Sequence, residues 1–262
     1  MKFFSVILLL VVFVSSPAPL ALGQAPDTQG FQILEQVIAA AGGRQAWNEM
    51  KDFRASGTFS LYSGETVVDS GNATLAGTGL KRFHLAATLN HETRTWLWKD
   101  GAGILSAANT HSSTIGRHNL AALEGITSPI QKLLALLDSP SRSIQLVESM
   151  LIDGRQTYRL RLVRTAKDRN DAVLLGRPSF TTDFIIDQKT FLIIAIEDTI
   201  YPNTNTSGAF QHRVTYGDFR SVAGLQVPFS MKEEIAGQST WGLQLESFEA
   251  NVGVAASEFE LQ

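Results

Sequence analysis

The sequence predicts an α+β protein with a single domain, built on one antiparallel β-sheet with few helices. Three observations predict this fold class. Hydrophobic and polar residues alternate along most of the chain, which is typical of half-buried strands. Short turn sequences separate these segments, and helical spacing is confined to the N-terminal region and one central insert. With 262 residues, 44% of them hydrophobic, the chain is long enough to build a large core.

The N-terminal residues have the features of a signal peptide. Lys2 provides a positive start, and residues 3–14 form an almost uninterrupted apolar run of about a dozen residues, the length of a signal-peptide core. This run is shorter than the ~20 residues that cross a bilayer, although an uncleaved anchor is the alternative. Residues 23–25 fit a small-x-small cleavage site. We therefore expect residues 1–25 to be a signal peptide, and residues 26–262 to be an exported domain, soluble in the periplasm or cell envelope after cleavage.

The first helix is expected at residues 31–41, where apolar side chains recur at intervals of three and four. Gly42 and Gly43 follow directly and are typical of a helix end. A short helical turn with Trp47 as its apolar anchor should come next.

The strands are predicted by period-two alternation, as in residues 53–61, where apolar and polar positions alternate throughout. Asp100-Gly101 and Asp153-Gly154 are typical hairpin turns. Strands are expected at residues 53–61, 66–76, 81–89, 93–99, 144–152, 157–164, 180–187, 191–198, 210–216, 227–235 and 240–248.

A central segment interrupts this rhythm. Residues 109–143 begin with a polar loop and continue into a helical insert near residues 117–138. Helical spacing covers 120–123 and 129–137 within the insert. Because strands lie on both sides of it without a change in composition, one continuous sheet is favoured over two domains.

A twisted sheet of more than about ten strands curls instead of staying flat. The sequence therefore predicts a strongly curved antiparallel sheet, an incomplete β-barrel of about 11–12 strands, with a few helices closing its concave side. Helix side chains could fill the concavity, or part of it could remain an apolar pocket for a hydrophobic ligand.

Candidate pocket residues come from the apolar faces of the expected strands. For some of them, such as Trp96 and Trp98, an ordinary core position is the alternative. An apolar run within a charged loop could form a lid over the opening, or could pack locally. The candidate lining residues are Phe83, Leu85, Trp96, Trp98, Leu160, Leu162, Leu192, Ile194 and Ile196, and the candidate lid residues are Val173, Leu174 and Leu175.

Several function classes are disfavoured. The chain has no cysteine, which excludes thiolate metal sites and cysteine nucleophiles, and its net charge of −3 argues against nucleic-acid binding. The five histidines do not follow metal-ligand spacing, and no local catalytic or phosphate-binding motif occurs. Asp183 and Glu197 lie in expected strands, at positions that should face solvent or a sheet edge. We expect no metal, no cofactor and no catalytic residues.

Short motifs recur at turns and strand edges. These are Gly42-Gly43 with Trp47, Asp153-Gly154-Arg155 with Tyr158, Phe184-Ile185-Ile186-Asp187 with Thr190, Tyr216-Gly217-Asp218-Phe219-Arg220, Gly224-Leu225-Gln226-Val227-Pro228-Phe229, and the segment 251–259.

With the order of elements, these motifs resemble the LolA/LolB-like lipoprotein-localisation-factor superfamily, as a divergent exported member. The resemblance implies a curved antiparallel sheet closed by helices around a hydrophobic cavity for acyl chains. Two departures limit it. The chain lacks the N-terminal cysteine of the lipid-anchored receptors, and no residue aligns with the arginine that gates the cavity of the carriers.

The expected function is therefore a non-enzymatic, exported carrier or binding protein that shelters an acylated ligand, a lipoprotein or a lipid. Its partners would be this lipid or acylated protein cargo and a membrane-associated donor or acceptor protein. The alternative is an envelope protein-interaction or sensor module that uses the same sheet. A hydrolase is a distant third.

Overall fold

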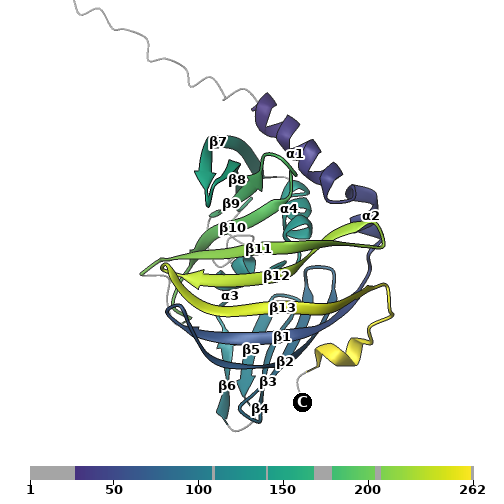
Figure 1. The fold of residues 1–262 in the computed structure, drawn as a ribbon, viewed down its shortest axis with the longest axis vertical. Coiled ribbons are helices and arrows are strands. Elements are labelled where there is room, and N and C mark those ends of the chain that lie inside the picture. Colours follow the sequence, from purple (N-terminus) through teal and green to yellow (C-terminus); the bar gives the residue numbers. More distant parts are fainter. Residues whose placement is uncertain (1–26, 108–109, 140, 168–178, 204–207, 261–262) are drawn as a thin grey trace, which may run out of the picture.

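The computed structural model describes most of the chain, namely residues 27–107, 110–139, 141–167, 179–203 and 208–260 (Figure 1). The expected signal peptide, residues 1–25, lies outside the described residues. Within the described part, no helix combines the length and the apolar character that a membrane crossing requires.

Few helices accompany a large set of strands. The helices are α1 (Thr28–Ala40), α2 (Arg44–Glu49), α3 (Arg117–Leu123), α4 (Pro129–Leu137) and the 3-10 helix η1 (Ala256–Phe259). The strands are β1 (Phe53–Ser63), β2 (Thr66–Thr78), β3 (Arg82–Leu89), β4 (Glu92–Lys99), β5 (Ala102–Ala107), β6 (Thr110–Ile115), β7 (Arg142–Ile152), β8 (Arg155–Thr165), β9 (Ser179–Asp187), β10 (Ile193–Ile200), β11 (Phe210–Val222), β12 (Leu225–Ile235) and β13 (Gln238–Ala250).

The 13 strands of the described residues belong to one sheet, in the order β6-β5-β4-β3-β2-β1-β13-β12-β11-β10-β9-β8-β7. Neighbouring strands are antiparallel, and β1 pairs with β13 from Phe53↔Ala250 onward, so the two ends of the domain meet in mid-sheet. The predicted antiparallel sheet with few helices is thus confirmed. The expected count of about 11–12 strands was too low, because β5 and β6 form a hairpin where the sequence indicated a turn and a polar loop.

One face of the sheet carries the core and is called the inner face below. Phe53, Ala55 and Phe59 of β1 point to it and are buried, as the alternation predicts. Leu133 of α4 and Val37 of α1 belong to the same hydrophobic cluster. On the opposite face, Phe259 of η1 packs against Leu97 and Ala76 in a smaller cluster. The larger hydrophobic cluster, and with it the region described next, therefore lies on the inner face.

The Gly42-Gly43 pair lets α1 end against the sheet. Both glycines have positive φ, +112° and +90°, which residues with a Cβ rarely adopt. A Cβ on Gly42 would lie 2.4 Å from the carbonyl oxygen of Gly224 in the β11–β12 turn. Trp47 Nε1 donates a hydrogen bond of 2.9 Å to the carbonyl of Ala41, which fixes the turn into α2.

Candidate functional site

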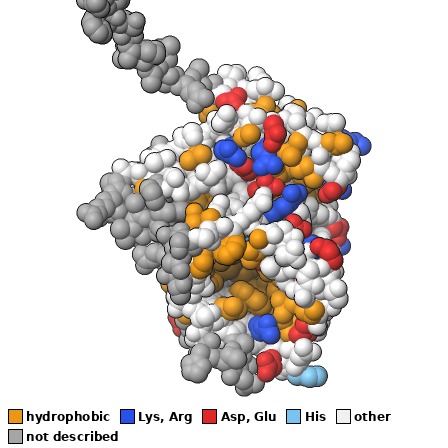
Figure 2. Space-filling model, turned by 90° about the vertical axis from the view of Figure 1, so that its left-hand side faces the viewer, with side chains coloured by type: hydrophobic (Ala, Val, Ile, Leu, Met, Phe, Trp, Pro, Cys, Tyr) orange, Lys and Arg blue, Asp and Glu red, His pale blue; other side chains and the backbone are white. Residues whose placement is uncertain are grey.

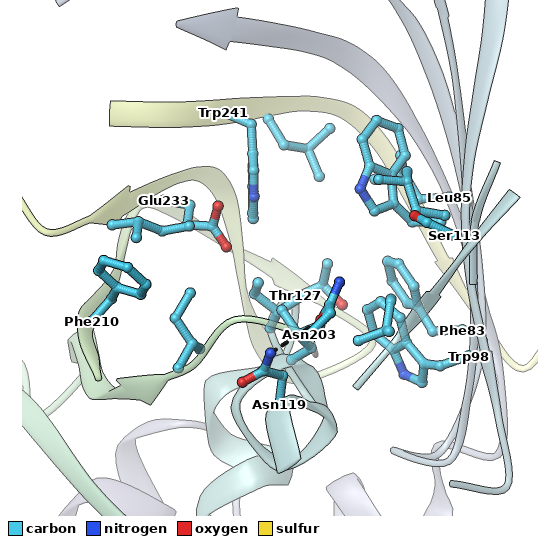
Figure 3. Close-up of a pocket in the computed structure, with 18 of the residues that line it drawn as sticks. Phe83, Leu85, Trp98, Ser113, Asn119, Thr127, Asn203, Phe210, Glu233 and Trp241 are labelled. Atoms are coloured by element: carbon cyan, nitrogen blue, oxygen red, sulfur yellow. Dashed lines mark hydrogen bonds between the residues drawn. The ribbon is translucent and has the colours of Figure 1, made fainter. Parts of the chain in front are cut away.

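A pocket of about 670 Å³ opens on the inner face, between strands β3–β6, strands β11–β13, helix α3 and the residues that follow β10 (Figure 3). Its volume lies in the range of ~300–1,000 Å³ that is typical of small-molecule sites. Most of the described residues that line it are apolar: Phe59, Phe83, Leu85, Trp96, Trp98, Leu105, Ile115, Leu123, Ile126, Ile200, Pro202, Phe210, Ile235, Trp241 and Leu243.

Paired aromatic rings form part of the walls. Phe59 lies between Trp96 and Trp241, with ring centroids 4.9 Å and 5.8 Å away. Phe83 stacks on Trp98 at 4.2 Å. Aromatic pairs at such distances contribute ~0.5–1.5 kcal/mol beyond their burial, which stabilises these walls.

The pocket is accessible from solvent. Phe210, on its lining, keeps 42% of its surface exposed, and Trp96, Trp241 and Ile200 are only half-buried. On one face of the molecule, hydrophobic side chains gather around a hollow (Figure 2). A hydrophobic ligand could therefore enter without unfolding of the core.

Asn119 of α3 holds the segment that follows β10. Its Nδ2 donates to the carbonyl of Tyr201 (2.7 Å), and its Oδ1 accepts from the Tyr201 backbone N–H (2.9 Å). Asn203 Oδ1 accepts from Gly116 N–H (3.1 Å) and from Asn119 Nδ2 (3.3 Å). These bonds tie one rim of the pocket to the start of α3, more than 80 residues earlier in the chain.

A chain of charged side chains reaches the pocket from behind. Lys132 Nζ of α4 lies 2.9 Å from Asp198 Oδ2, whose Oδ1 lies 2.7 Å from His212 Nδ1. His212 Nε2 lies 3.0 Å from Glu233 Oε1, and Glu233 lines the pocket. Thr240 Oγ1 donates to the other Glu233 oxygen. Each buried charge thus faces an opposite one, as burial of ions requires.

The neighbouring carboxylates keep His212 protonated. Burial alone would lower its pKa, but the hydrogen bonds that it donates to Asp198 and Glu233 outweigh burial and raise the pKa from 6.5 to about 9. Burial alone would raise the pKa of Asp198, but Lys132 and His212 bring it below its ordinary value. At neutral pH His212 is therefore cationic and Asp198 is ionised.

Comparison with solved structures shows what this architecture resembles. A LolA superfamily protein from Nitrosomonas europaea aligns with a TM-score of 0.52 at 13% identity, over 86% of this chain and 96% of its own. A DUF1329 family protein from Desulfovibrio piger aligns with a TM-score of 0.53 at 14% identity, over 90% and 97%. A domain from Vibrio parahaemolyticus, assigned to outer membrane lipoprotein sorting, aligns with a TM-score of 0.50 at 11% identity, over 88% and 96%.

The chain has the fold of the LolA superfamily. No protein-family model and no curated protein matches the sequence. The LolA-like fold is thus established by structure, at identities that carry no function with them.

Four predicted lining residues lie on the pocket of this LolA-like fold: Phe83, Leu85, Trp96 and Trp98. They form two directly opposed pairs of β3 and β4, Phe83↔Trp98 and Leu85↔Trp96. Alternation alone was enough to place them on the inner face.

The other five predicted lining residues do not line this pocket. Leu160, Leu162 and Ile196 are buried in the core cluster that includes residues of α1 and α4. Leu192 precedes β10, and the register passes from Ile193↔Ile186 to Ala195↔Ile185, which leaves Ile194 in a bulge. The expected common face of residues 192, 194 and 196 is therefore broken.

The candidate lid residues, Val173, Leu174 and Leu175, lie outside the described residues. The sequence prediction missed Lys132, Asp198, His212 and Glu233. A signal was present, because His212 and Glu233 are in phase with the buried Val214 and Met231 on their strands.

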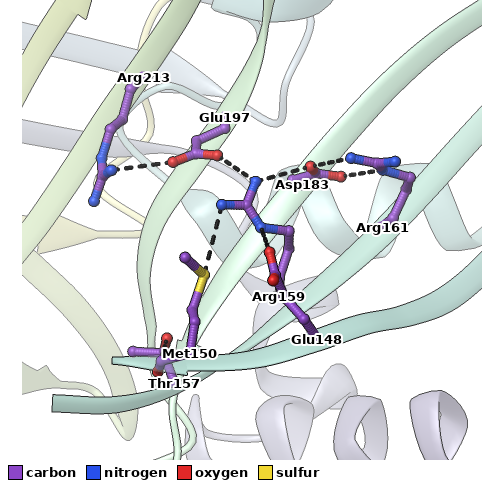
Figure 4. Close-up of polar contacts among 8 residues, drawn as sticks. All are labelled: Glu148, Met150, Thr157, Arg159, Arg161, Asp183, Glu197 and Arg213. Atoms are coloured by element: carbon purple, nitrogen blue, oxygen red, sulfur yellow. Dashed lines mark hydrogen bonds and ion pairs between the residues drawn. The ribbon is translucent and has the colours of Figure 1, made fainter. Parts of the chain in front are cut away.

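A second ionic network lies on the opposite face of the sheet (Figure 4). Arg161 donates two hydrogen bonds of 2.7 Å to Asp183. Arg159 reaches Asp183 (3.2 Å) and Glu197 (2.7 Å), and Arg213 also contacts Glu197 (3.1 Å). Asp183 and Glu197 are only 6% and 8% exposed and lie on interior strands, so the expectation that they face solvent or a sheet edge was wrong. Their arginine partners, on neighbouring strands, make this burial possible.

Proposed function

We propose that this protein is an exported, non-enzymatic carrier that shelters an acylated ligand, a lipid or the acyl chains of a lipoprotein, in the pocket of its LolA-like fold. Residues 1–25 would direct export and be removed, and residues 26–262 would form the carrier domain, soluble in the periplasm or envelope. The sheet would curve around the ligand. A membrane-associated donor or acceptor protein would load or unload it.

One observation carries the proposal: a solvent-accessible pocket of about 670 Å³ whose described lining is mainly aliphatic and aromatic. Each buried methylene contributes ~0.8 kcal/mol, so two more carbons should tighten binding about tenfold. A lipoprotein-sorting domain with the same fold supports this reading.

The test measures binding of fluorescent acyl probes with chains of 8, 10 and 12 carbons to the delipidated protein. Affinity should rise about tenfold per two carbons until the pocket is filled, and Trp96→Asp should lower it at least tenfold by placing a charge on the wall. Phe248→Asp is the matched control, because Phe248 is also a half-buried aromatic residue stacked on a phenylalanine, Phe53, at 5.0 Å. It does not line the pocket.

Absence of uptake by folded wild-type protein would contradict the proposal. Equal affinity of the two variants for the acyl probes would show that the probes bind outside this pocket. A co-purifying protein without lipid would favour the interaction module instead.

A further inference from the structure

The pocket has an unusual charge balance for a lipid site. Glu233 is the only charged side chain among the described residues that line it, and none of these is a lysine, arginine or histidine. The other described lining residues with polar side-chain atoms are Ser113, Asn119, Thr127, Tyr201 and Asn203, together with Trp96, Trp98 and Trp241, which carry indole N–H donors. A free fatty acid or a phosphate head group is normally held by a cation, and this lining offers none.

The Glu233 carboxylate is held in place from behind and points into the pocket (Figure 3). His212 Nε2 donates to one oxygen at 3.0 Å, and Thr240 Oγ1 donates to the other. A carboxylate has about four acceptor positions, so each oxygen retains capacity for a donor on the pocket side. Because His212 already balances its charge, Glu233 needs no cation from the ligand.

We propose that the pocket selects ligands whose apolar chain ends in an uncharged, hydrogen-bond-donating head group, a hydroxyl or an amide, and that Glu233 accepts the hydrogen bond from this head group. A carboxylate head group would meet Glu233 in apolar surroundings and be repelled. The inference rests on the proposed function and specifies its ligand class.

The test compares three ligands with identical 12-carbon chains: dodecanamide, 1-dodecanol and dodecanoate. Each displaces the uncharged probe N-phenyl-1-naphthylamine from the wild-type protein at pH 8, where dodecanoate is ionised. The amide and the alcohol should displace the probe at concentrations at least tenfold lower than dodecanoate. Equal or stronger displacement by dodecanoate would overturn the inference while leaving the carrier function standing. If no ligand displaces the probe, both proposals fail.

Glu233→Gln tests the residue itself. Removal of the negative charge should strengthen dodecanoate binding severalfold. Dodecanamide and dodecanoate should then displace the probe at nearly equal concentrations, so that the ratio of these concentrations is close to one. Glu234→Gln is the control, because Glu234 is the next residue on β12, is half-buried and does not line the pocket. An unchanged ratio in folded Glu233→Gln protein would contradict the role of Glu233. The wild-type ligand series decides the question if Glu233→Gln does not fold, since that variant removes a partner of His212.

Discussion

The two halves of the inner face share the alternation of apolar residues but differ in how completely they are filled. Near β8–β10, Leu160 and Phe184 are fully buried and share one core with residues of α1 and α4. Near β3–β6, Trp96 and Ile115 remain half-buried and border the pocket. Apolar residues alternate with other residues in both halves, so alternation decides which face a side chain occupies. Whether that face is filled depends on helices that pack from elsewhere in the chain.

The buried charged residues lie between the two halves. Substitution of one of them is expected to cause the largest loss of stability. Asp198→Asn removes the charge that faces Lys132, whose side chain is 5% exposed. Loss of one partner of a buried pair costs ~3–5 kcal/mol, so the free energy of unfolding in urea should fall by about this amount.

Asp138→Asn provides the control for this variant. Asp138 pairs with Arg44 at 3.0 Å at the end of α4, but its side chain is 69% exposed. Exposed pairs contribute less than ~1 kcal/mol. Similar losses of unfolding free energy in the two variants would show that the buried pair of Lys132 and Asp198 contributes no more to stability than the exposed pair.

These charged residues also show which features of the fold the sequence did not predict. Strands such as β1 and β3, both hairpin halves around Asp153-Gly154, and helix α4 followed from local patterns. The inward placement of His212 and Glu233 did not, because a charged residue within an alternating strand is normally taken to face water. Only its partners make burial favourable, and these lie on α4, β10, β11 and β12. Strand β6 was missed because its described inward side chains, Ser113 and Ile115, give a weak hydrophobic alternation.

A second prediction concerns pH. The pKa of His212 is about 9 in the folded protein and 6.5 ordinarily, so its protonation stabilises the folded state. This contribution is complete below pH 6.5 and is lost as the pH rises through about 9. At 1.36 kcal/mol per pH unit it amounts to roughly 3 kcal/mol.

The measurement is the free energy of unfolding at pH 6.5 and pH 9.5, for the wild type and for His212→Gln. The wild type should lose roughly 3 kcal/mol more than the variant over this range. The charged groups that face His212 are Asp198 and Glu233, with Lys132 behind Asp198. An equal loss in both proteins would assign the pH dependence to other groups.

The smallest expected difference in stability is between two variants that carry the same substitution, one in each half. It tests the comparison of the two halves most directly. Leu160→Ala opens a closed cavity in the filled half, where Leu160 has no exposed surface, and such truncations cost ~2–5 kcal/mol. Leu85→Ala only widens a pocket that already exists. Leu85 is also buried, at 6% exposure, but it borders this space, so its truncation creates less new cavity. We expect Leu85→Ala to cost at least ~1 kcal/mol less, and to change acyl-probe binding while Leu160→Ala does not. Equal costs with unchanged probe binding would mean that the pocket half is as tightly filled in solution as the half that α1 and α4 cover.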